Sequence, residues 1–94
     1  MSVEFVEVIV SGRVQGVGYR EFARRAAERH GVAGFARNRS DGTVEARLVG
    51  APSVLEAMLA DLRKGPAHGR VERVEIVARG AAAAESGFVI AATL

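Results

Sequence analysis

The residues best suited to chemistry lie between Gly12 and Arg20, where the sequence reads GRVQGVGYR. Gly16 and Gly18 allow successive backbone N–H groups to point into one hollow, and a helix expected to begin at Tyr19 adds the positive end of its dipole. The stretch is not a Walker A loop, because no Gly-Lys-Ser/Thr sequence follows, and it lacks the third glycine of a dinucleotide-binding fingerprint. It predicts a loop that binds phosphate or another oxyanion.

Arg20 is the charged side chain best placed to complete such a loop. An exposed cation at the beginning of a helix is disfavoured by roughly 0.3–1 kcal/mol, and a bound anion would reverse the sign of that effect. Arginine also binds phosphate through two parallel hydrogen bonds, which lysine cannot do. From these residues alone an alternative stays open, in which Arg20 is a solvated arginine beside Glu21 or Arg24 and the glycines only turn the chain.

The second candidate is Asn38, which strand alternation over residues 35–39 places on the same face as Ala36. An asparagine at the end of a strand that faces a helical layer is unusual, because asparagine is poorly represented in strands. The other interpretation is a turn residue that bonds to its own backbone beside Asp41. Without further information the turn interpretation is favoured.

Hydrophobic periodicity supplies the elements that must position these residues, in the order strand, helix, strand, strand, helix, strand. The expected strands cover residues 3–11, 35–39, 44–49 and 71–79, a short extra strand covers 88–91, and the expected helices cover 19–30 and about 52–64. Asp41-Gly42 is a strong signal for a hairpin between the second and third strands. Residues 79–86 fit either a loop or a helical turn.

This order predicts an α+β fold, a ferredoxin-like βαββαβ sandwich with two helices on one face of an antiparallel sheet and a short extra C-terminal strand. We expect one domain over residues 1–94, because so short a chain cannot support two cores. Pro52 suits the first position of the second helix, although Ser53 and Glu56 could instead form a capping box. The pairing of the last strand and the role of the Ala81–Ala84 run stay open.

Composition restricts the function further. The absence of cysteine excludes disulfides, thiolate metal sites and a cysteine nucleophile, and neither His30 nor His68 has a partner at metal-ligand spacing. The net charge of +2 is too small to indicate nucleic-acid binding. No apolar run approaches the ~20 residues of a membrane helix, and the first residues lack the features of a signal peptide. We expect a cytoplasmic protein with no membrane or nucleic-acid partner.

Together the two candidate segments resemble the signatures of the acylphosphatase family. The family's first signature, Gly-Arg-Val-Gln-Gly-Val-x-Phe/Tyr-Arg, is met at every fixed position by residues 12–20. The second signature is Gly-aromatic-small-basic-Asn, followed after three residues by Gly, after one more by Val and after five more by Gly. It is met by Gly34-Phe35-Ala36-Arg37-Asn38, Gly42, Val44 and Gly50. Gly65-Pro66 with Val71 and Val74 also resembles the family, so the likeness covers nearly the full length of the chain.

The resemblance implies hydrolysis of the carboxyl–phosphate bond of a small acyl phosphate, without metal or cofactor, to give a carboxylate and inorganic phosphate. It implies that Asn38 orients the attacking water. It also implies that the phosphate is bound by Arg20 together with the loop amides of Gln15, Gly16, Val17, Gly18 and Tyr19. No general acid is required, because the leaving carboxylate has a conjugate acid with a pKa of about 4.

Two other functions stay open at this stage. A similar domain could hold an acyl or carbamoyl phosphate for another enzyme without catalysis, although a free-standing chain of 94 residues favours the enzyme. A sheet that binds RNA would need aromatic residues interleaved with basic ones. The positions expected to be exposed, Glu45, Arg47, Glu75 and Arg79, have hardly any aromatic neighbours. A monomer is the simplest expectation for the assembly.

Overall fold

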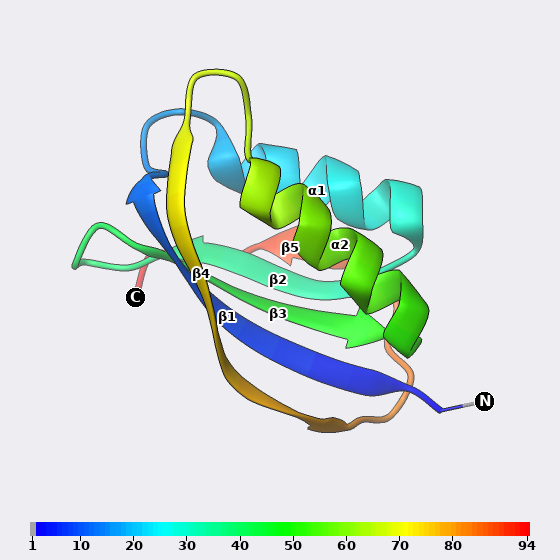
Figure 1. Cartoon of the computed structure of the whole chain (residues 1–94). Coiled ribbons are helices and arrows are strands. Elements are labelled where there is room, and N and C mark those ends of the chain that lie inside the picture. The colour runs from blue at the N-terminus through cyan, green and yellow to red at the C-terminus, as the bar shows by residue number, and fades with distance from the viewer. Residues whose placement is uncertain (1) are drawn as a thin grey trace.

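The computed structural model describes residues 2–94 and shows a five-stranded sheet with two helices packed on one face (Figure 1). The elements are β1 (Glu4–Arg13), α1 (Tyr19–His30), β2 (Ala33–Asn38), β3 (Val44–Gly50), α2 (Pro52–Lys64), β4 (Arg70–Ala81) and β5 (Phe88–Ile90). The strand order across the sheet is β4-β1-β3-β2-β5. The predicted ferredoxin-like βαββαβ fold with a short extra strand is confirmed.

The sheet is mixed, because the short extra strand, whose pairing the sequence left open, pairs in parallel. β1 pairs antiparallel with β3 and β4, and β2 pairs antiparallel with β3, whereas β5 runs parallel to β2. The reason is topological: β4 ends at the same end of the sheet where β2 begins (Figure 1). The connection 82–87 therefore crosses that end and starts β5 in the direction of β2. Residues 82–87 form a loop without a helical turn.

The core lies between the sheet and the helices, and strand alternation builds it as predicted. Val6, Val8 and Val10 on β1 are fully buried, and they pair in register with buried residues of β3. The helices close the core with a stripe of small residues on α1 and a stripe of larger ones on α2. These are Ala23, Ala26 and Ala27 on α1, and Leu55, Met58, Leu59 and Leu62 on α2.

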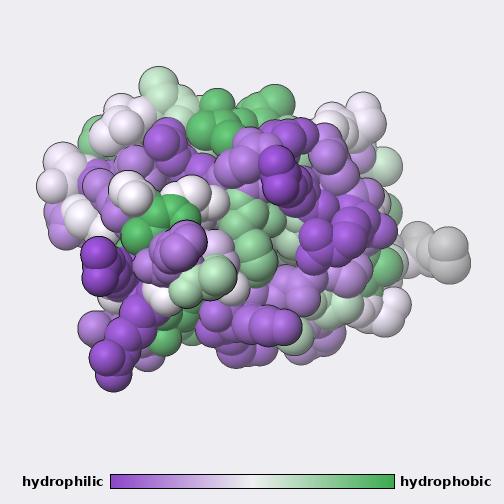
Figure 2. All heavy atoms as spheres, turned by 90° about the horizontal axis from the view of Figure 1, so that it is seen from above, coloured by the Kyte–Doolittle hydropathy of each residue, from purple (hydrophilic) through white to green (hydrophobic). Residues whose placement is uncertain are grey.

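The helix ends follow from local backbone chemistry. Gly31 ends α1 in the left-handed region, where a glycine is favoured. α2 begins after Ala51 with Pro52 in its first turn and with no side-chain cap, so the proline start is confirmed and the capping box is not formed. Among the described residues, no helix is both long and apolar enough to cross a bilayer. Hydrophilic side chains cover most of the face seen from the helix side, between separate hydrophobic patches (Figure 2).

Candidate active site

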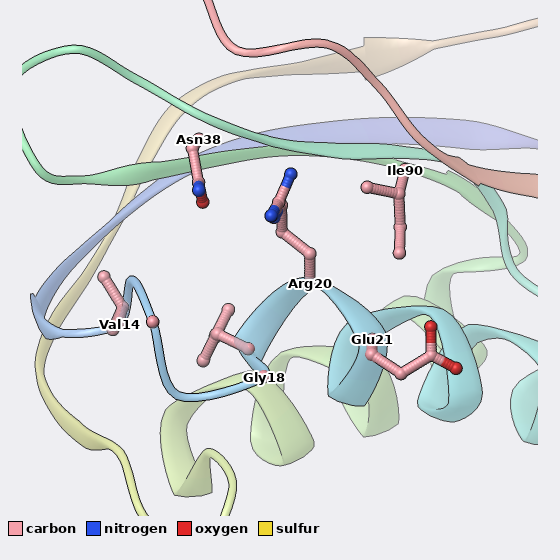
Figure 3. Close-up of a pocket in the computed structure, with 8 residues that line it drawn as sticks. Val14, Gly18, Arg20, Glu21, Asn38 and Ile90 are labelled. Atoms are coloured by element: carbon pink, nitrogen blue, oxygen red, sulfur yellow. The ribbon is translucent and has the colours of Figure 1, made fainter.

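The predicted anion loop connects β1 to α1 and lies opposite the end of β2. A pocket of about 170 Å³ lies between them, and Arg20 and Asn38 enter it from α1 and β2 respectively (Figure 3). We call this pocket the cradle. Its lining residues are Val14, Gly16, Gly18, Tyr19, Arg20, Glu21, Asn38 and Ile90. The fold thus brings together residues from three separate stretches of the chain.

The backbone of the loop leaves its amide groups free for a ligand. Gly16 and Gly18 have φ angles of 73° and 79°, which L side chains rarely adopt. A Cβ atom on either glycine would meet no atom within 4 Å, so backbone conformation rather than crowding requires glycine there. Within residues 2–94, the N–H groups of residues 15–18 donate no hydrogen bond, and no side chain caps α1. An anion in the cradle would meet unpaired donors at the positive end of a helix.

Arg20 rises from the first turn of α1 toward the sheet and faces Asn38 across the cradle (Figure 3). It is half-buried and forms no ion pair with any described residue. The neighbouring carboxylate of Glu21 is bound instead by Arg24 and, at 3.3 Å, by Arg25. The hydrogen bonds from Arg24 lower the pKa of Glu21, which therefore stays ionised within its own helix face. The geometry favours the anion-binding interpretation of Arg20 over a solvated arginine paired to Glu21.

Asn38 is the last residue of β2, and its side chain points from the strand into the cradle (Figure 3). Its Oδ1 atom is buried and accepts no hydrogen bond from the described residues. The turn interpretation is wrong, because the β2–β3 turn is organised by Asp41, which accepts hydrogen bonds from Thr43. A buried carbonyl oxygen without a donor costs about 1–3 kcal/mol. A water or ligand that donates to Oδ1 would recover that free energy.

Gln15 and Val17 are the predicted site residues that do not line the cradle. The Gln15 side chain reaches the β2–β3 turn, where Nε2 donates to the carbonyl oxygens of Arg39 at 2.8 Å and Thr43 at 2.9 Å. Val17 packs against the core. Gln15 therefore holds the loop against the turn that follows Asn38. No local sequence signal could reveal this contact, since its partners lie 24 and 28 residues away.

The C-terminal segment, whose contribution the sequence left open, is a second part of the site. Ile90 at the end of β5 lines the cradle. Beyond it, the N–H of Ala91 donates to the Ala36 carbonyl at 2.9 Å and the N–H of Leu94 donates to the Asn38 carbonyl at 3.0 Å. The segment after β5 thus continues along β2 as far as Asn38 and supports the strand end that carries its side chain.

Tyr19, which also lines the cradle, has a structural role at the start of α1. Its ring is buried, and its hydroxyl donates to the Leu62 carbonyl at 2.8 Å, which ties the start of α1 to the end of α2. Burial raises the pKa of the Tyr19 hydroxyl, so it stays protonated. Among residues 2–94, no group of three or more histidine or carboxylate side chains is arranged to hold a metal ion.

The comparison with known proteins decides the family, since the family model described as Acylphosphatase matches residues 6–90. The chain belongs to the acylphosphatase family. An acylphosphatase of Azorhizobium caulinodans is 46% identical over 95% of this chain and 96% of its own length. One of Rhizobium etli is 51% identical over 77% of each chain. The crystal structure of acylphosphatase from Bacillus subtilis matches with a TM-score of 0.86 and 29% identity, covering 95% of this chain and 98% of that one.

Membership of the acylphosphatase family confirms the resemblance of the two signature segments and the predicted enzyme class. Acylphosphatases hydrolyse small acyl phosphates, and this is the activity that the family and the fold support here.

Proposed function

We propose that the cradle carries out the hydrolysis, with Arg20 and the amides of residues 15–19 holding the phosphoryl group and Asn38 orienting the attacking water. One observation carries this assignment. Among residues 2–94, the buried Oδ1 of Asn38 has no donor and the guanidinium of Arg20 has no carboxylate partner, and both groups face the same pocket of about 170 Å³. An acceptor for a water proton thus lies opposite a cation for the phosphate.

Binding relies on charge neutralisation. The guanidinium of Arg20, the free loop amides and the dipole of α1 together present positive charge to the phosphate oxygens. In the transition state of phosphoryl transfer, negative charge is spread over the three equatorial phosphate oxygens. Donors that are already aimed at those oxygens stabilise this state without reorganisation, so the cradle accelerates the reaction as well as binding the substrate.

The chemical step needs one positioned water. Asn38 accepts a hydrogen bond from this water through Oδ1, which aims a lone pair of the water oxygen at phosphorus. A P–O bond forms as the bond from phosphorus to the bridging oxygen breaks, and the electron pair leaves with the carboxylate. The water proton passes to a phosphate oxygen of the substrate, which yields inorganic phosphate. The carboxylate departs unprotonated, so the reaction requires no side chain as a general acid.

The test measures hydrolysis of a model acyl phosphate by Arg20→Ala and Asn38→Ala. We expect each variant to lose on the order of 10²-fold or more in kcat/KM. Arg20→Ala should also weaken competitive inhibition by inorganic phosphate, whereas Asn38→Ala should leave it nearly unchanged, because Asn38 acts on the water. Arg63→Ala is the matched control, since Arg63 is exposed on α2 and forms no ion pair with a described residue. Wild-type activity in either site variant would refute its assignment.

The same assay separates the enzyme from a non-catalytic module that holds acyl or carbamoyl phosphate. Multiple turnovers by the isolated protein support the enzyme, and stoichiometric binding without turnover would support the module. A chelator should leave the activity unchanged, because the proposed reaction uses no metal or other cofactor. Activity that disappears with chelator and returns with a divalent cation would refute a metal-independent reaction.

We also propose that the protein works as a cytoplasmic monomer and that the small acyl phosphate is its partner. The absence of cysteine fits a reducing compartment. The exposed charges along the outer edge of β4 oppose pairing of two sheets edge to edge.

A further inference from the structure

A second hollow, of about 470 Å³, lies between α1 and the loop 65–67 that follows α2. We call it the groove. Its walls include the side chains of Phe22, Pro66 and Ala67, so its lining is largely apolar, and Arg25 and Arg29 lie at its rim. The cradle accounts for binding of the phosphoryl group, but none of its residues is assigned to the acyl group of the substrate.

The groove and the cradle are neighbours that share part of their lining. Gly18 and Glu21 line both of them. Gly18 has no side chain, and the space beside its Cα atom is open to at least 4 Å from an added Cβ. This leaves room beside Gly18 for a substituent on a phosphate in the cradle to extend toward the groove.

The side from which the water attacks phosphorus also indicates that the acyl group lies in the groove. Asn38 belongs to β2, and α1 packs on β2 and β5 on one side and on α2 on the other. The groove is lined by residues of α1 and the loop after α2, and by none from β2. A water held by Asn38 therefore approaches phosphorus from the β2 side. In-line displacement requires the leaving group on the opposite side, which is the side of the groove.

We propose that the groove is the acyl-binding subsite and selects acyl phosphates whose acyl group is an apolar, planar ring. This rests on the proposed function of the cradle. The ring would contact Phe22 and Pro66, which form an apolar wall. Phe22 is held in place by packing on the core, with its ring 5.8 Å from that of Tyr19.

The two arginines at the rim of the groove, Arg25 and Arg29, are also compatible with an aromatic acyl group. The side chain of Arg25 is 71% exposed, and Glu21 holds its guanidinium at 3.3 Å. Arg29 is also exposed and lies 3.3 Å from Asp61. Each rim guanidinium thus already has a carboxylate beside it, and a guanidinium can also stack on an aromatic ring. A distal carboxylate on the substrate would have to compete with Glu21 and Asp61 for these same cations.

The test compares kcat/KM for benzoyl phosphate with that for acetyl phosphate. Ala67→Asp places a carboxylate in the groove at an exposed loop position, and Ala84→Asp is the control, at an exposed loop position outside the groove. Taking the ratio for the two substrates removes the effect of the added charge on their shared phosphate. We expect the ratio to fall about tenfold in Ala67→Asp and to stay unchanged in the control. Inhibition by inorganic phosphate should weaken more in Ala67→Asp than in the control, because Ala67 lies nearer the cradle, and the substrate ratio corrects for this effect.

Phe22→Leu is an independent variant, because leucine keeps the apolar packing but removes the aromatic face. We expect it to lower the same ratio about threefold to tenfold, while circular dichroism shows an unchanged fold. Ratios within twofold of wild type in both Ala67→Asp and Phe22→Leu would overturn the subsite and leave the hydrolytic function standing. A wild-type protein that prefers succinyl phosphate to benzoyl phosphate would also overturn it. Failure of the wild type to turn over either substrate would refute the proposed function itself.

Discussion

The carbonyl oxygens of Arg39 and Thr43 both accept a hydrogen bond from one nitrogen atom, Nε2 of Gln15. These contacts join the loop that carries the free amides to the turn that follows Asn38. The two halves of the cradle are far apart in sequence, so their spacing depends on such long-range contacts. Gln15 acts here as a positioning residue, through its side chain, in addition to the proposed role of its backbone amide.

Replacing Gln15 by glutamate tests this role at the scale of one residue. The carboxylate of Gln15→Glu has no donor and would face two carbonyl oxygens, so we expect the free energy of unfolding to fall by about 1–3 kcal/mol at pH 7. Urea denaturation measures the loss. Gln15→Met is the control of similar size, and it should cost less because it only removes the two hydrogen bonds. A Gln15→Glu variant as stable as the wild type would contradict the role of the side chain.

Arg20 and Asn38 show how far a single sequence leads at this scale. Residue types alone favoured Arg20 as an anion ligand but favoured Asn38 as a turn residue, and only the resemblance to a family reversed the second preference. The structure gives the physical reason. Asp41 already supplies the side-chain acceptor of the turn, which leaves the Asn38 amide to point into the cradle.

At the scale of elements, a polar contact joins the C-terminal end of α1 to the last turn of α2. Nε2 of His30 lies 2.7 Å from Oδ2 of Asp61, and Arg29 lies 3.3 Å from the same carboxylate. The hydrogen bond from His30, together with the charges of His30 and Arg29, holds the pKa of Asp61 below its ordinary value of 3.8. This contact and the bond from Tyr19 to Leu62 attach the two ends of α1 to the same last turn of α2.

The lowered pKa of Asp61 predicts how stability changes with pH. Because the folded state binds the proton more weakly than the unfolded state, the contact stabilises the fold above about pH 4 and loses its effect as the pH falls through the lowered pKa. The side chain of Asp61 is 30% exposed, so we expect only roughly 0.5 kcal/mol at pH 6. Wild type and Asp61→Asn should therefore differ at pH 6 and converge near pH 2.5, as measured by thermal unfolding.

A double-mutant cycle supplies the control for this contact. In the His30→Gln background, the effect of Asp61→Asn at pH 6 should shrink, because the main partner of the carboxylate is gone. A difference between wild type and Asp61→Asn that is equally large at pH 6 and pH 2.5 would show that the stabilisation does not come from the charge of Asp61.

Most elements could be predicted from sequence because their signals are local. Alternation of valines identified β1, the alanine and leucine stripes identified the two helices, and Asp41-Gly42 identified the hairpin. The parallel pairing of β5 could not be predicted, since it depends on which end of the sheet β4 reaches. The bonds from Ala91 to Ala36 and from Leu94 to Asn38 could not be predicted either, because both join segments distant in sequence.

At the scale of the whole molecule, the sheet has two free edges of different length. β5 is a strand of three residues, whereas β4 has twelve residues and pairs only with β1. A long free edge is a template for pairing with another chain, and charged side chains are a common protection against it. Five exposed charged residues lie along β4, namely Arg70, Glu72, Arg73, Glu75 and Arg79. The same strand also exposes Ile76 and Val77, which would favour association without those charges.

The charges on β4 therefore predict the assembly state and how to change it. We expect a monomer by size-exclusion chromatography with light scattering. Arg73→Val combined with Glu75→Val removes a pair of side chains 3.5 Å apart, keeps the net charge at +2 and should produce dimers or larger species. Glu56→Leu combined with Arg63→Leu makes an equal change of charge on α2, which has no free strand edge, and should stay monomeric. If both double variants associate equally, general hydrophobicity rather than the edge of β4 controls association. If neither associates, the remaining charges and the twist of β4 protect the edge without Arg73 and Glu75.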